Sequence, residues 1–168
     1  MFKIKIAVVA GASLAALGAF RPAAGAQDPS RSVWDGVYTE EQAKRGAALY
    51  GSDCASCHGT DLSGADEIPA LSGPAFLANW DGLTLGDLSE RVHRSMPPNR
   101  PGQLSRRQIT DILCHVLIVN GFPAGKTELE PKTELLKQIR IEATKGKGRV
   151  GRRMTRDEYE GVPLIYLL

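Results

Sequence analysis

The sequence predicts an all-α domain with three main helices. Three segments place apolar residues at the i, i+3, i+4 spacing of an amphipathic helix, and each starts at Thr or Ser with Gln or Asp three positions later. No segment alternates apolar and polar residues for long enough to form a strand. Residues 27–142 have the length of one small domain and contain no internal repeat. We therefore expect a single helical domain.

The first helix should begin at Thr39, where Gln42 completes a capping box. Its apolar face consists of Ala43, Gly46, Leu49 and Tyr50. Because glycine destabilises a helix, Gly46 indicates that another element packs closely against this face.

The second helix should begin near Thr84, with Asp87 in the capping position, and should end at about Ser95 because Pro97-Pro98 follows. The chain before it, from Cys57 to Thr84, is rich in Gly, Pro and Ser and is expected to be a long loop. The third helix should begin at Ser105 and end at Asn120-Gly121. Its core stripe consists of Ile109, Ile112, Leu113 and Val116.

The pentapeptide Cys54-Ala55-Ser56-Cys57-His58 predicts covalent attachment of a c-type haem. Two thiols three positions apart can each add to a vinyl group of one porphyrin, and His58 can then bind the iron through an imidazole nitrogen. A zinc half-site would need a second Cys/His pair, and Cys114-His115 lacks ligand spacing. A thioredoxin-like dithiol would need a βαβ context. The motif therefore favours one covalent haem c.

The second axial ligand is predicted to be Met96. This methionine follows the second helix and precedes two prolines, so it lies on a stiff loop, and its thioether is a soft ligand that raises the haem potential. The alternative is a core methionine that fills a gap. We expect His93 to be a surface residue and His115 to lie with Asp111 on the polar side of the third helix. Cys114 should be a half-covered filler or a free thiol able to link two chains.

The N-terminus predicts export to the periplasm. Lys3 and Lys5 precede an apolar run at residues 6–17, and Ala24-Gly25-Ala26 offers a cleavage site, so residues 1–26 are expected to be a signal peptide. The alternative is a retained membrane anchor. After signal removal we expect no membrane span.

The body of the chain and its tail differ in the sign of their net charge. Residues 27–142 carry twelve basic and sixteen acidic residues, whereas residues 143–168 carry six basic and three acidic ones. The tail is also rich in Gly and is expected to be disordered. Nothing in this distribution indicates a surface for nucleic acid.

The chain from about Trp34 to Ile141 resembles a class I monohaem cytochrome c. The matching residues are Gly46, Tyr50, Cys54–Gly59, Pro69-Ala70-Leu71, Met96-Pro97 and the helix at 105–120. It is most similar to cytochromes c associated with periplasmic quinoprotein dehydrogenases that act on alcohols or sugars. That likeness rests on Phe76, Trp80, Met96-Pro97-Pro98, Asp111-Ile112-Leu113 and residues 120–125. The resemblance implies a small class I fold, with three main helices and long loops around one covalent haem.

The resemblance also implies roles for individual residues. The Pro69 carbonyl would accept the Nδ1 proton of His58, and Trp80 would lie near a haem propionate. The first and third helices would cross at Gly46, Tyr50, Leu113 and Val116. The implied function is a one-electron carrier, not an enzyme, with a quinoprotein dehydrogenase as donor and an oxidase as acceptor. The alternatives are a haem c subunit fixed in a dehydrogenase complex, and a haem enzyme or gas sensor with an open iron site.

Overall fold

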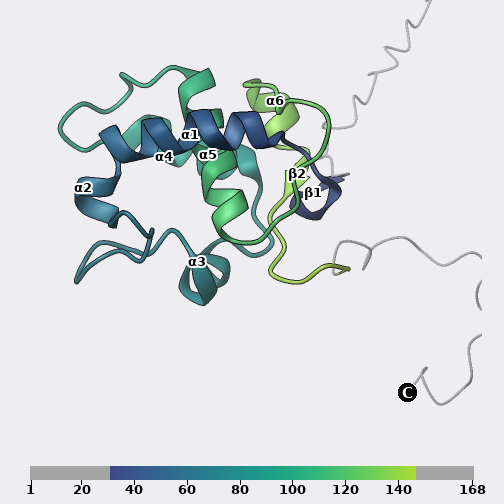
Figure 1. Ribbon diagram of the computed structural model, residues 1–168, viewed down its shortest axis with the longest axis horizontal. Helices are drawn as coiled ribbons and strands as arrows, with labels where there is room; N and C mark the ends of the chain where they lie inside the picture. The colour runs from purple at the N-terminus through teal and green to yellow at the C-terminus, as the bar shows by residue number, and fades with distance from the viewer. Residues whose placement is uncertain (1–30, 147–168) are drawn as a thin grey trace, which may run out of the picture.

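The computed structural model describes residues 31–146 (Figure 1). The expected signal peptide and all but the first residues of the expected tail lie outside this range. Within it the helices are η1 (Val33–Asp35), α1 (Glu40–Asp53), α2 (Ala55–His58), α3 (Gly73–Trp80), α4 (Leu85–Ser95), α5 (Arg106–Val119) and α6 (Thr133–Leu136). The strands β1 (Arg31–Ser32) and β2 (Ile139–Arg140) form a two-residue parallel pair. The fold is therefore all-α apart from this small sheet. No helix among the described residues is both long and apolar enough to cross a membrane.

The three predicted helices are confirmed as α1, α4 and α5. Each has the expected capping box, in which the Thr or Ser side chain accepts from the backbone N–H three residues later and that residue's side chain accepts from the cap N–H. In α1 the Gln42 side chain also donates to the Leu129 carbonyl oxygen at 2.9 Å. The start of α1 is therefore tied to the chain that follows α5.

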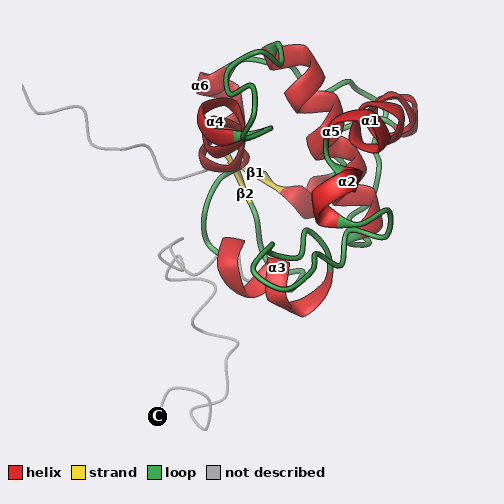
Figure 2. Cartoon of the chain, turned by 90° about the vertical axis from the view of Figure 1, so that its left-hand side faces the viewer, coloured by secondary structure: helices red, strands yellow, loops and turns green. Residues whose placement is uncertain are grey.

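Helix α1 lies directly across α5 at Gly46 (Figures 1 and 2). A Cβ atom at Gly46 would lie 1.8 Å from the Asp111 carbonyl oxygen and 3.1 Å from the His115 Cβ. The Tyr50 ring packs against the His115 ring, with 5.3 Å between ring centroids. The close approach predicted from Gly46 is confirmed. These contacts involve Asp111 and His115, which lie within two residues of the Leu113 and Val116 implied by the resemblance.

The prediction that Asp111 and His115 lie on a polar side of α5 is wrong, because α1 covers that side. Asp111 is only 4% exposed, and its carboxylate accepts from Arg45 Nε at 2.9 Å. Burial lowers the pKa of the half-buried His115 below its ordinary value of 6.5 and so favours the neutral imidazole. Cys114 is 0% exposed, which corrects the expectation of a half-covered residue, and its free thiol is too deeply buried to link two chains.

Helix α3 was not expected, since it lies inside the predicted loop. Pro74 occupies its first turn, where a missing N–H costs nothing. Phe76 is fully buried and fixes the helix on the core. The Asn120 side chain accepts from the Gly73 N–H at 2.9 Å and donates to the Leu71 carbonyl at 3.0 Å. The end of α5 therefore holds the start of α3.

The chain after α5 returns over the core and ends beside the first strand. Its apolar residues Leu129, Leu136, Ile139 and Ile141 are buried. Ile141 exchanges backbone hydrogen bonds with Gly82 and Leu83 at 2.9 and 2.8 Å. The Ala143 N–H donates to Asp81 Oδ1 at 2.8 Å. This returning segment therefore pairs with β1 through β2 and is hydrogen-bonded to residues 81–83, which connect α3 to α4.

Candidate functional site

The five residues Cys54–His58, here called the attachment turn, follow α1 without a break. Cys54 caps both α1 and α2, and its N–H donates to the Tyr50 carbonyl at 2.9 Å. The N–H groups of Cys57 and His58 donate to the Cys54 carbonyl at 3.1 and 3.0 Å. This single turn places the two cysteines on one side, because residues three apart are neighbours on a helix. Both are free thiols, with Cys54 half-buried and Cys57 exposed.

His58 is held in one orientation. Its side chain is buried, and Nδ1 lies 2.9 Å from the Pro69 carbonyl oxygen. Because a carbonyl can only accept, Nδ1 carries the proton and Nε2 keeps a free lone pair. The hydrogen bond implied by the resemblance is therefore present. His58 offers Nε2 as a preoriented metal ligand.

The loop between His58 and Pro69 is tightly folded. The Tyr50 hydroxyl donates to the Gly59 carbonyl at 2.7 Å, and the Gly64 N–H donates to the His58 carbonyl at 2.9 Å. Gly64 has φ +71°, and a Cβ there would lie 2.3 Å from the Ile68 carbonyl oxygen. Only glycine fits this position, which lets the loop return to the imidazole.

The environment of Cys54 differs from that of a reactive dithiol. Burial raises the pKa of its thiol to about 11, and the neighbouring Asp53 carboxylate adds to the rise. Thiol–disulfide enzymes need a lowered pKa at one cysteine. Among residues 31–146 no three His, Cys, Asp or Glu side chains converge so as to hold a metal ion. Both observations weigh against the dithiol and zinc alternatives. Two thiols on one helical turn beside a preoriented imidazole fit the thioether attachment of a haem.

Met96 lies at the end of α4 and begins the Met96 loop, residues 96–104. It is half-buried and extended, and its N–H donates to the Val92 carbonyl at 2.8 Å. The Met96 loop and α2 lie at the same end of the molecule (Figure 1). An ion pair joins Arg100 of this loop to Asp53, the last residue of α1, which directly precedes the attachment turn. The structure thus brings the loop that carries Met96 to the attachment turn.

Trp80 and His93 are both partly buried. Trp80 ends α3 and packs partly buried against the core. His93 is half-buried rather than a surface residue, and its Nδ1 has no hydrogen-bond partner among the described residues. No sequence motif identifies Asp53 and Arg100 as partners, because they are 47 residues apart and come into contact only in the folded chain.

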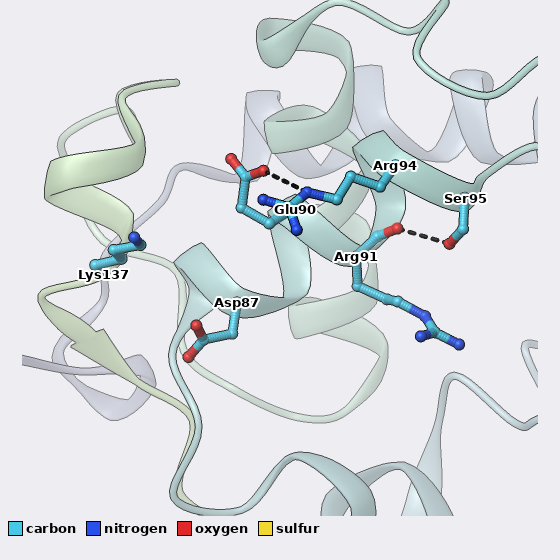
Figure 3. Close-up of a pocket in the computed structure, with 6 residues that line it drawn as sticks. All are labelled: Asp87, Glu90, Arg91, Arg94, Ser95 and Lys137. Atoms are coloured by element: carbon cyan, nitrogen blue, oxygen red, sulfur yellow. Dashed lines mark hydrogen bonds and ion pairs between the residues drawn. The ribbon is translucent and has the colours of Figure 1, made fainter.

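A separate depression lies on the outer face of α4 (Figure 3). It is lined by Asp87, Glu90, Arg91, Arg94, Ser95 and Lys137. Glu90 pairs with Arg94 at 3.5 Å and with Arg106 at 2.7 Å. These charged, open walls do not suit an apolar macrocycle, so we do not assign the cofactor to this depression.

A match to one family model agrees with this site. A family model described as "Cytochrome C oxidase, cbb3-type, subunit III" matches residues 41–116, which include α1 from its second residue, the attachment turn and most of α5. A solved structure titled as the sulfane dehydrogenase SoxCD from Paracoccus pantotrophus matches at 25% sequence identity, over 89% of this chain and 77% of that chain, with a TM-score of 0.44. A search of curated proteins found no significant match.

The family match and the helical architecture together define the fold and the cofactor. The chain has the small all-α fold of a cytochrome c, and its cofactor is one covalently bound haem c. Such a domain serves haem-based electron transfer.

Proposed function

We propose that this protein is an exported one-electron carrier, with haem c bound through Cys54 and Cys57 and with His58 and Met96 as axial ligands. The observation that carries the proposal is the attachment turn, in which His58 is fixed by the Pro69 carbonyl at 2.9 Å. When bound, the haem supplies a one-electron iron couple. The protein residues attach it, orient one ligand and provide the other.

Each residue has a distinct part in this proposal. The two thiols would form thioethers and keep the macrocycle against α2. Pro69 keeps Nε2 of His58 free for the iron and makes the imidazole a better donor. Met96 would complete the coordination from a loop fixed at α4, and its sulfur would raise the potential relative to a second imidazole. We also propose that Trp80 lies near a propionate.

This ligand set favours a carrier over an enzyme or gas sensor. Catalysis at haem needs a vacant distal position, and a sensor needs one for its gas. A methionine in that position leaves no room for substrate and requires little rearrangement between the two oxidation states. The same argument makes this chain non-catalytic itself.

We propose the periplasm as its location, a quinoprotein dehydrogenase as electron donor and a terminal oxidase as acceptor. The location is supported by the N-terminal pattern of residues 1–26, which lie outside the described range. The partners are supported by the resemblance of Phe76, Trp80 and residues 96–98 to cytochromes c of that kind. Docking should be weak and brief, because a carrier must release its partner after each electron.

A second candidate is a haem c subunit fixed in a larger redox complex. It is favoured by the description of the matching family, which is that of an oxidase subunit. A carrier should purify as a free monomer, whereas a subunit should elute with other chains during size-exclusion chromatography at low salt.

Stopped-flow reduction tests the proposed donor. The ferric protein is mixed with a purified quinoprotein dehydrogenase and its alcohol or sugar substrate. We expect reduction to be at least tenfold faster than that of an unrelated cytochrome c of similar potential, and to change with ionic strength as charge-steered encounters do. Equal rates for both cytochromes would reject the donor and leave only the electron-carrier function.

A further inference from the structure

We infer that the Arg100–Asp53 ion pair is a latch that holds the Met96 loop against the attachment turn and so keeps the Met96 sulfur on the iron. The inference rests on the proposed His58 and Met96 ligation. Arg100 and Asp53 are positioning residues: neither is assigned a contact with the haem iron.

Asp53 is placed where it needs a cationic partner. It is the last residue of α1, where the helix dipole disfavours a negative charge. Its side chain is only 10% exposed, so the carboxylate has lost most of its water. Ser52 Oγ donates to it at 2.8 Å, and the Arg100 guanidinium supplies the compensating charge. Without Arg100 this carboxylate would be left largely unpaired.

Arg100 stands at the middle of the Met96 loop. Its N–H donates to the Pro97 carbonyl at 2.9 Å, and its own carbonyl accepts from Gln103 at 3.4 Å. The loop is fixed at its start by α4 and at its end by Leu104, which is buried. The ion pair therefore attaches the centre of a loop whose two ends are already held.

The latch meets the attachment turn beside its first cysteine. Asp53 directly precedes Cys54, and both Asp53 and Arg100 act electrostatically on the Cys54 thiol. The two segments that would supply covalent attachment and the second axial ligand are thus joined by one side-chain contact. Opening of the Met96 loop must break that contact.

The consequence concerns how often Met96 leaves the iron. Local opening of a loop is governed by the contacts that it breaks. An added ligand such as imidazole can occupy the sixth position of the ferric iron only after Met96 has left. The affinity for imidazole therefore measures the opening equilibrium, and loss of the latch should raise it about tenfold.

The experiment compares the holoprotein with Arg100→Ala, Asp53→Asn and the double variant by imidazole titration of the ferric form. Each single variant should bind imidazole about tenfold more tightly, and the double variant should bind no more tightly than either, because both substitutions break one contact. Arg100→Lys keeps the positive charge, so its affinity for imidazole should lie between those of the wild type and Arg100→Ala. Arg94→Ala is the matched control, since it removes the same charge from a side chain that is 78% exposed.

Titrating Met96→Ala in parallel shows whether a negative result rejects the latch alone or also the assignment of Met96 as a ligand. If Met96→Ala increases affinity but Arg100→Ala behaves like Arg94→Ala, the latch is rejected and the ligation stands. Additive effects of the two single variants would also reject the latch. If Met96→Ala leaves the affinity unchanged, both the ligation and the latch are wrong.

Discussion

Replacing Cys54 and Cys57 together by alanine should abolish covalent haem. The two thiols share one side of the attachment turn, and no other exposed or half-exposed cysteine exists among the described residues. A gel of the denatured protein stained for haem peroxidase activity should show a stained wild-type band and an unstained variant band. The expected effect is a complete loss.

Cys114→Ala is the matched control for this experiment. It also removes a thiol, but from a residue that is 0% exposed inside α5. Its band should keep the stain. A stained band from the Cys54→Ala, Cys57→Ala double variant would contradict thioether attachment at the attachment turn.

Gly46→Ala should destabilise the protein by about 3 kcal/mol, the upper range for overpacking a tight contact. In an isolated helix this substitution would stabilise, because alanine is the better helix former. Here the added methyl would lie 1.8 Å from the Asp111 carbonyl oxygen, so α1 and α5 would have to separate. Denaturant unfolding of the holoprotein, followed by circular dichroism, measures the change in unfolding free energy.

Gly51→Ala provides the control within the same helix. A Cβ at Gly51 would have no neighbour within 4 Å, so this substitution should stabilise by about 0.5–1 kcal/mol. We therefore expect the same substitution to lower the unfolding free energy at Gly46 and to raise it at Gly51. Equal effects would show that Gly46 does not mark the crossing of the two helices.

The helix starts could be predicted from the sequence because their signals are local. A capping box is complete within four residues, as at Thr39 and Gln42, and needs no knowledge of the rest of the chain. Gly46 was also informative, since a glycine inside an amphipathic face has few purposes other than close packing.

The faces of α5 could not be predicted, because a nonlocal contact decides them. Asp111 reads as a surface residue in the sequence, but its carboxylate is satisfied by Arg45, 66 residues away. Helix α3 was missed for a related reason: its Gly and Pro are typical of loops, and Phe76 reveals the helix only when the core it fills is known.

In the candidate site, too, the local features could be predicted from the sequence and the nonlocal contacts could not. The attachment turn is contiguous in sequence, so its residues could be found from the motif alone. The bond from His58 to Pro69 spans eleven residues and was reached only through the family resemblance. The contact of Asp53 with Arg100 has no counterpart in motif or periodicity, and only the folded chain reveals it.

The most direct test of the electron-carrier account is carbon monoxide binding by the reduced protein, followed by absorption spectroscopy in wild type and Met96→Ala. If His58 and Met96 fill both axial positions, the wild-type spectrum should be low-spin and should not change when carbon monoxide is added. The variant should bind the gas, and its potential should be lower if water or a harder ligand replaces sulfur. Avid binding by the wild type would contradict the account and identify an open-site haem protein instead.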